Sequence, residues 1–302
     1  MVFWLWTKDL LLSGALYLSL ILSSVALGYL DIYFAPGLIL SLWALKEKKL
    51  ELFVVFYSIA CFTKWQPLII LPFAVLSILN ISSIRDWKKI DLTKMIVKIV
   101  LPALVIISFT IFFFRSSLFK SFDMTLNHTY LSGNALNFNW IMTYLLLSIY
   151  PETHGDFFNG NIRYLDITSL KIVLIPKLLF YIFYITAIFL CFKSEKTFKN
   201  TIFFSLLGYL SYFIFNTGVH ENHLFLAAIL AYVLVWIDKE YLYLLIYIVL
   251  MANFNLFLFY GISGTGISRH IGFDISLLAA ILNVIFFLSI YSLAIFHYKK
   301  KA

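Results

Sequence analysis

The densest group of chemically active side chains lies in one short turn, residues 217–223, between two apolar runs. His220, Glu221, Asn222 and His223 follow one another there. Adjacent imidazole and carboxylate groups can exchange a proton with a substrate, and a protonated imidazole binds anions. The same order also suits a helix N-terminus, where an acidic first turn is favourable. A zincin-type metal helix is set aside, because the two histidines are three positions apart rather than four.

Four further polar groups lie at the ends of apolar runs, where burial near hydrocarbon costs free energy unless the group has a partner or a function. They are the 28–31 turn with Asp31, the KWQP segment with Lys64 and Gln66, the SGNALNFNW stretch with Asn134, Asn137, Asn139 and Trp140, and the GISGTGISRHIGFD stretch with Arg269, His270 and Asp274. Asp31 and Lys64 can also simply mark span ends, and an asparagine-rich stretch can be an ordinary turn. We expect all five groups on the same side of the molecule.

The combined set fits a ligand that carries both a phosphate and a sugar. Lys64, Arg269 and protonated histidines match a phosphate or pyrophosphate, whereas Asn, Gln and Trp side chains match sugar hydroxyls and sugar faces. A lipid-linked sugar phosphate has both parts, and its polyprenyl tail would lie in an apolar groove between spans.

The elements that position these groups are predicted to be membrane helices. The chain has 302 residues, of which 62% are hydrophobic and 13% charged, against roughly 25% charged in a soluble domain. Its apolar runs of about 15 to 24 residues are near the length that crosses the hydrocarbon layer as a helix. They lack the alternation of β-barrel strands. The net charge of +8 comes from short basic clusters between the runs, which favours topology signals over nucleic-acid binding.

Hydropathy predicts an all-α, polytopic transmembrane bundle of about ten spans in a single integral domain, 1–302. Sixteen of the 23 Lys and Arg residues fall on one side of this arrangement, which predicts that both termini are cytoplasmic. The spans are 10–28, 31–45, 50–64, 67–80, 97–114, 170–192, 201–216, 223–237, 241–259 and 275–296.

The longest stretch between spans, about 115–169, is predicted on the outer side. It contains the apolar segment IMTYLLLSIY, which is too short to cross a membrane. Letting it cross would also move the basic KSEKTFK cluster to the outer side. We therefore expect a re-entrant or interfacial helix there.

Four of the polar segments resemble motifs of the GT-C superfamily of membrane glycosyltransferases. GYLDIYF resembles the Gly-Gln-x-Asp turn of that family, and FTKWQPLIILP resembles its Lys-x-Gln-Pro segment. SGNALNFNW is similar to the outer Asn-x-x-Asn-x-Trp element, and GVHENHLFLAAIL to the His-Glu motif of the dolichyl-phosphate mannose and glucose branches and their bacterial relatives. The order agrees over about residues 15–235.

The resemblance implies a polyprenyl-phosphate sugar donor used on the extracytoplasmic or lumenal face. His220 would contact the donor phosphate, Glu221 would hold the motif or the acceptor, and Lys64 and Gln66 would line the donor pocket. Asp31 would substitute for the catalytic base, since the acidic loop that precedes GYLD in the family, together with its two spans, is missing here. The chain thus resembles an N-terminally shortened member.

The site residues predicted from the sequence fall into three groups. The predicted catalytic residues are Asp31, His220 and Glu221. The residues predicted to bind the donor phosphate are Lys64, His220, His223 and Arg269. The residues predicted to bind the sugar or the acceptor are Gln66, Asn134, Asn137 and Trp140. Tyr29 and Asn222 depart from the family motifs, and Asn222 in place of a basic residue weakens a charge-based hold on phosphate. The pattern specifies no particular cofactor and is compatible with a divalent metal.

The predicted function is transfer of a hexose from a polyprenyl-phosphate donor to an extracytoplasmic glycan or lipid acceptor. Besides the donor and the acceptor, we expect contact with membrane lipid and no binding of nucleic acid. Two alternatives stay open, a transporter or flippase for lipid-linked sugar and a non-catalytic membrane partner. A transporter would carry polar residues through the bilayer midplane, whereas here they gather at one side.

Overall fold

The protein is a bundle of α-helices. Its structure, a computed structural model, describes residues 1–83, 86, 88, 90–126, 130–155, 165, 170–267 and 273–301. About 81% of the structure is helical. The strands in the described part of the chain are β1 (Ser132–Gly133) and β2 (Val219–His220). The predicted all-α class is confirmed.

Two antiparallel helices, α12 (Phe198–Phe215) and α13 (Leu224–Ile237), form the centre of the bundle. Almost every residue of α13 is buried, because a helix that is apolar on all sides must be covered on all sides. The helices packed around this pair begin and end as follows: α1 (Val2–Thr7), α2 (Leu10–Ser19), η1 (Leu22–Ala26), α3 (Asp31–Lys46), η2 (Gln66–Ile70), α5 (Leu71–Leu79), α11 (Leu170–Lys193), α14 (Leu242–Tyr260) and α15 (Ile275–Lys301).

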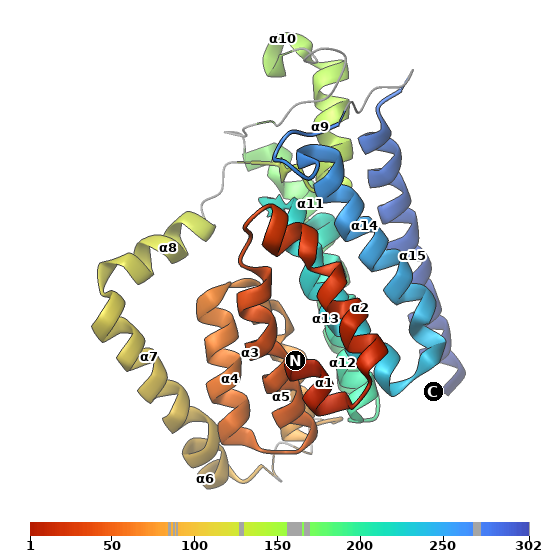
Figure 1. The fold of residues 1–302 in the computed structure, drawn as a ribbon. Helices are drawn as coiled ribbons and strands as arrows, with labels where there is room; N and C mark the ends of the chain where they lie inside the picture. Colours follow the sequence, from red (N-terminus) through yellow and green to blue (C-terminus); the bar gives the residue numbers. More distant parts are fainter. Residues whose placement is uncertain are drawn as a thin grey trace.

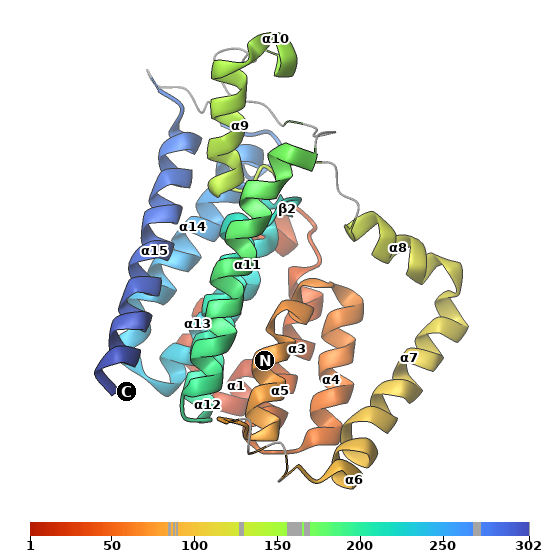
Figure 2. The same ribbon diagram turned by 180° about the vertical axis from the view of Figure 1, so that it is seen from behind.

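A side arm of the fold stands next to α4 (Leu50–Thr63), which itself packs along α3. The arm consists of α6 (Leu92–Met95), η4 (Ile96–Val100), α7 (Leu101–Phe114) and α8 (Ser116–Leu126), and Figures 1 and 2 show it on the flank of the bundle. Only 6% of its apolar span is buried, against 72% for α12. The arm therefore offers its apolar side chains to the surroundings, as expected of a helix in contact with lipid.

Among the described residues, five helices are long and apolar enough to cross a membrane, which makes this a membrane protein by composition and helix length. They are Leu92–Phe114, Lys171–Lys193, Phe198–Phe215, Lys239–Tyr260 and Ile275–Phe296. Each of the ten apolar segments predicted from the sequence is helical over most of its length. Several of the other segments form shorter apolar helices, so the count of ten spans stays a prediction.

The two ends of the bundle differ in polarity and in length of their loops. At one end lie α9 (Phe138–Ile149), α10 (Pro151–His154) and β2, as Figure 2 shows. At the other end lie the short connections after α3, α11 and α13, with their basic residues, and the C-terminus. Near this basic end, Trp6 of α1 packs against Phe198 and Trp236. The predicted outer and basic turns thus separate to opposite ends of the bundle.

The predicted short helix in the 115–169 stretch is present as α9, with 12 residues. Asn137 caps it, because the Asn137 side chain accepts a hydrogen bond from the backbone N–H of Trp140. α9 packs against α12 and α15. Its re-entrant or interfacial position in a membrane stays a prediction.

Close packing of α12 depends on Gly208. A Cβ atom at this position would overlap the ring atoms Cζ and Cε2 of Phe73 on α5. We expect Gly208→Ala to lower the free energy of unfolding by about 1–3 kcal/mol through overpacking, measured as reduced thermal stability in detergent. Gly14→Ala on α2 is the matched control, since nothing lies within 4 Å of its Cβ position. Equal stability of the two variants would contradict the predicted contact.

Candidate functional site

The site begins at the turn that joins α12 to α13. β2 pairs in parallel with β1, so that Ser132 lies opposite Val219 and Gly133 opposite His220. The backbone N–H of Gly218 also donates to the carbonyl of Tyr130 at 3.1 Å. The SGNALNFNW stretch and the histidine-containing turn, separate in the sequence, are therefore held together by backbone hydrogen bonds.

His220 occupies a position that only a glycine neighbour permits. A Cβ atom on Gly133 would lie 2.6 Å from Nδ1 of His220 and 2.9 Å from its Cε1. The ring also meets Tyr130 edge to face, with centroids 6.1 Å apart. About a third of the His220 side chain, 34%, stays exposed. Burial and then the nearby charge of Lys64 lower the pKa of His220 below its ordinary value.

Glu221 is buried beside His220, with 3% of its side chain exposed. Its Oε1 accepts a hydrogen bond from the hydroxyl of Tyr29, and Tyr260 of α14 also interacts with the carboxyl group. Its Oε2 lies 3.8 Å from Nδ1 of His220 and has no hydrogen-bond partner within the described residues. Burial raises the pKa of Glu221 above its ordinary value.

A second buried carboxylate, Asp31, lies at the start of α3. Its Oδ1 pairs with the Lys64 ammonium at 2.5 Å, and its Oδ2 accepts a hydrogen bond from Ser23. Only 1% of the Asp31 side chain and 12% of the Lys64 side chain are exposed. Asp31 is the first residue of α3, and Lys64 directly follows the last residue of α4. Because α3 and α4 run antiparallel, these two residues meet at the same end of the bundle.

The two carboxylates belong to one polar cluster, which we call the outer cluster: Ser23, Tyr29, Asp31, Lys64, Asn134, His220, Glu221 and Tyr260. Tyr29 connects the two parts, since it is two residues from Asp31 and donates to Glu221. The charge of Lys64 also acts on both His220 and Glu221. The expectation that the 28–31 and 217–223 turns lie on the same side is confirmed.

His223 and Asn222 complete the turn from within. Nδ1 of His223 accepts the backbone N–H of His220 at 3.4 Å, and the His220 side chain accepts the backbone N–H of His223, so the two residues form a capping box. The Tyr209 hydroxyl donates to the carbonyl of His223 at 2.7 Å. Asn222 is buried. His223 therefore shapes the start of α13, and its proposed contact with phosphate would be additional to this role.

The amide and indole groups of the 134–140 stretch have well-defined partners. Asn134 donates to the Tyr260 hydroxyl at 3.2 Å, which joins it to the outer cluster. Asn137 and Asn139 donate to backbone carbonyls at the end of α12. The Trp140 indole donates to Ser276 at 2.8 Å. These described bonds hold the loop against α12 and α15.

The remaining predicted residues lie at the edge of the site or outside the described chain. Gln66 is half-buried at the start of η2, two positions from Lys64. The neighbouring Trp65 donates to Ser121 of α8 at 3.4 Å. Asp274 is buried and accepts from the backbone and the hydroxyl of Ser276. Arg269 and His270 lie outside the described residues.

Sequence reasoning missed Ser23, Tyr260 and Asn255 as contributors to this region. Asn255 on α14 accepts the N–H of Leu136 and donates to the carbonyl of Asn134. A polar residue inside an apolar run was the available signal, since such a residue needs a partner. The hydroxyls of Ser23 and Tyr260 gave no comparable signal, because serine and tyrosine are frequent in these spans.

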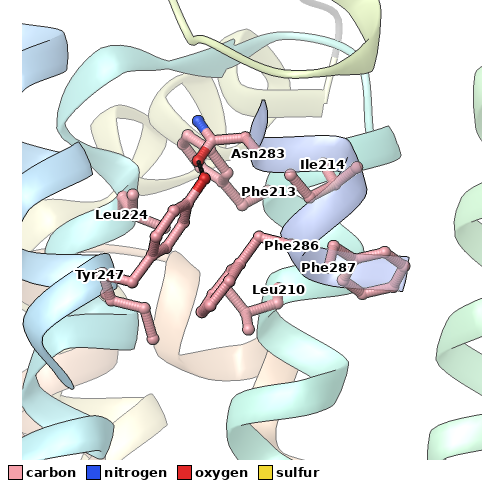
Figure 3. Close-up of a pocket in the computed structure, with 9 residues that line it drawn as sticks. Leu210, Phe213, Ile214, Leu224, Tyr247, Asn283, Phe286 and Phe287 are labelled. Atoms are coloured by element: carbon pink, nitrogen blue, oxygen red, sulfur yellow. Dashed lines mark hydrogen bonds between the residues drawn. The ribbon is translucent and has the colours of Figure 1, made fainter. Parts of the chain in front are cut away.

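A small pocket lies between α12, α13, α14 and α15. One of its lining residues, Leu224, directly follows the 217–223 turn in the sequence. Figure 3 shows its largely aromatic and aliphatic lining, in which the Tyr247 hydroxyl donates to Asn283 at 3.0 Å. Asn283 in turn donates to the carbonyl of Leu136. Such a lining offers a sugar few hydrogen-bond partners, so the outer cluster is the better candidate site.

The outer cluster offers a cation, a partly exposed imidazole and buried carboxylates within one region. In the part of the chain that the structure describes, no group of three or more His, Cys, Asp or Glu side chains is arranged to hold a metal ion. A lysine ammonium and an imidazole can bind an anion, and an imidazole beside a carboxylate can move a proton. Comparison with protein-family models, curated proteins and solved structures finds no match, so function is inferred from this geometry.

The Asp31–Lys64 pair should behave as a buried ion pair. We expect Lys64→Met to lower the free energy of unfolding by roughly 3–5 kcal/mol, because it leaves a buried carboxylate without its cation. The double variant Asp31→Asn with Lys64→Met should regain much of this loss. Thermal unfolding in detergent measures all variants. A double variant no more stable than Lys64→Met would contradict the pairing.

Glu221 should make stability depend on pH. Its pKa is raised from the ordinary 4.5 by burial, so the folded state holds this proton more tightly than the unfolded state. The stabilisation is full below pH 4.5 and is lost as the pH rises through the raised value. Thermal unfolding from acid to neutral pH should show a larger decline for the wild type than for Glu221→Gln. Parallel profiles would contradict the assignment.

Proposed function

We propose that the protein is a membrane glycosyltransferase of the GT-C type, which transfers a hexose from a polyprenyl-phosphate donor to a glycan or lipid acceptor. The observation that carries the proposal is the outer cluster, in which the 28–31 turn, Lys64, the 134 loop and the 217–223 turn meet at the end of the bundle opposite the basic loops. In this proposal the chain crosses the membrane about ten times, with the cluster at the extracytoplasmic or lumenal face.

The donor phosphate requires cations and hydrogen-bond donors at the cluster. Lys64 and His220 supply them, and His223 and Arg269 are further candidates from the sequence. A phosphate would compete with Asp31 for the Lys64 ammonium, since both are anions that pair with it. Charge on the departing phosphate is stabilised most where water is excluded, which is the environment of a side chain that is 12% exposed.

The sugar and acceptor require polar groups that can reach a hydroxyl. Among the predicted residues of this kind, Asn134 belongs to the cluster, and Gln66 follows Lys64 by two positions in the chain. Asn137 and Trp140 are fully buried and bonded internally, so we propose that they shape the loop that carries Asn134. Transfer itself requires a base that removes the acceptor proton while the acceptor oxygen attacks the anomeric carbon, with inversion.

A non-catalytic binding partner is the second candidate, and one observation favours it. Both oxygens of Asp31 already accept from Lys64 or Ser23, so the carboxylate that would substitute for the missing family base is engaged in structural contacts. Such a protein would bind the lipid-linked sugar without transferring the hexose. The transfer assay below separates the two candidates.

The proposal predicts hexose transfer by the full chain in membranes supplied with a labelled polyprenyl-phosphate hexose. His220→Ala should reduce the rate at least on the order of 100-fold, because it removes a group placed at the reacting bond. His154→Ala in α10 is the control and should keep wild-type activity. Transfer that is unaffected by His220→Ala, or donor binding with no transfer by the wild type, would overturn the proposal.

A further inference from the structure

One charged residue lies inside a helix of membrane-spanning length and belongs neither to the outer cluster nor to the core. The apolar span Lys171–Lys193 of α11 begins and ends with a lysine, and Lys177 is the charged residue between them. The Lys177 side chain is exposed, and it forms no ion pair or hydrogen bond with any other residue that the structure describes. A charge at such a depth costs free energy unless it has a partner or a function.

Lys177 lies below the outer end of the span. α11 runs from the end of the bundle that carries the outer cluster to the basic end, as Figure 2 shows. Lys177 follows Lys171 by 6 residues, which corresponds to about 9 Å along the helix. A lysine in this position extends its ammonium from the hydrocarbon side toward the headgroups of the outer leaflet. It therefore meets a lipid phosphate from below.

The side of α11 that carries Lys177 is directed toward η2 and α5. Positions 177 and 184 are two helical turns apart, so their side chains lie on the same side of the helix. The Tyr184 hydroxyl donates to the carbonyl of Ile69 in η2 at 2.6 Å, and its ring meets Phe73 of α5 with centroids 5.9 Å apart. Figure 2 shows α11 beside α5. Lys177 thus stands two turns above a contact between α11 and η2.

The lysine at the start of the span points in another direction. Lys171 is turned by about 120° from Lys177 around the helix axis. It shares its side of α11 with Leu178, Ile185 and Phe189, which are all exposed. That side faces lipid, whereas Lys177 lies where it borders the side covered by η2 and α5. We call this border the α11–η2 boundary.

Gln66 lies on the other side of the α11–η2 boundary. η2 is a 3-10 helix, in which residues three positions apart are aligned, so Gln66 lies one turn above Ile69 on the same side. Its side chain is half-buried. An ammonium and an amide therefore flank the boundary on the outer side of the Tyr184–Ile69 hydrogen bond. Both groups donate hydrogen bonds, and a phosphate accepts several at once.

We propose that Lys177, with Gln66 across the α11–η2 boundary, binds the phosphate of a lipid headgroup in the outer leaflet. The hydrocarbon chain of this lipid would lie along the exposed apolar side of α11. Gln66 follows Lys64 by two positions, so the site is at the lipid-facing approach to the outer cluster. Either a polyprenyl phosphate or an ordinary phospholipid carries this phosphate. The inference goes beyond the proposed hexose transfer and does not depend on it.

The test measures lipid binding to the full chain in detergent by native mass spectrometry, with polyprenyl phosphate, phosphatidylglycerol and uncharged polyprenol as probes. We expect Lys177→Met to weaken binding of phosphate-bearing lipid roughly 10-fold, because a charge-assisted hydrogen bond is lost. Binding of polyprenol should not change, and Lys177→Arg should bind phosphate-bearing lipid like the wild type. Gln66→Leu should cause a smaller loss, since a neutral amide binds phosphate less strongly than an ammonium.

Lys171→Met is the matched control, because it removes the same charge from the lipid-facing side of the same helix. It should bind all three probes like the wild type. Lys177→Gln should reproduce the loss if Lys177→Met does not fold. A loss confined to polyprenyl phosphate assigns the site to that lipid, and a loss that includes phosphatidylglycerol assigns it to lipid phosphates in general.

Three results would overturn the site: no binding of phosphate-bearing lipid by the wild type, unchanged binding in Lys177→Met, or an equal loss in Lys171→Met. Unchanged binding in Gln66→Leu would overturn its position beside η2. The measurement needs no turnover. If the wild type binds lipid phosphate at Lys177 but transfers no hexose, the glycosyltransferase proposal fails and this site stands.

Discussion

The site depends on one partly buried hydrogen bond, from the Tyr29 hydroxyl to the carboxylate of Glu221, between residues 192 positions apart in the chain. An ionisable group in the interior of an apolar bundle costs free energy unless it is paired. The bond satisfies one oxygen of Glu221 and fixes the 28–31 turn against the 217–223 turn. The bond adds a polar contact to the apolar packing between α3 and α13.

The other polar contacts extend the same constraint to neighbouring elements. Lys64 reaches Asp31 because α4 ends where α3 begins, and Asn134 reaches Tyr260 because β1 pairs with β2. Each contact gives a partner to a polar group that would otherwise be unpaired in the apolar bundle. The polar side chains of four separate segments are thereby concentrated at one end of an otherwise apolar bundle, which is the condition for binding a charged head group beside a lipid tail.

Hydropathy predicted the long helices well, because each of these is an apolar run bounded by charged or glycine-containing turns. α3, α4, α11 and α14 begin and end within a few residues of the predicted limits. The meeting of the outer turns was also predictable, since alternate turns of an up-and-down bundle lie at the same end. Sequence could not predict which polar groups pair, because Asp31 with Lys64 and Tyr29 with Glu221 are contacts between distant segments. The sequence also could not distinguish the role of Asn137, which caps α9, from that of Asn134, which belongs to the outer cluster.

The central claim is that the 28–31 and 217–223 turns face the same compartment, opposite the basic loops. Membrane-impermeant maleimide labelling of intact cells tests this directly, with single cysteines at Leu30, Thr217 and, as the opposite control, Lys48. The native Cys61 and Cys191 are buried and would be replaced by serine. We predict that the Leu30 and Thr217 positions label from outside, whereas the Lys48 position labels only after permeabilisation. Labelling of Leu30 and Thr217 from opposite compartments would contradict the account.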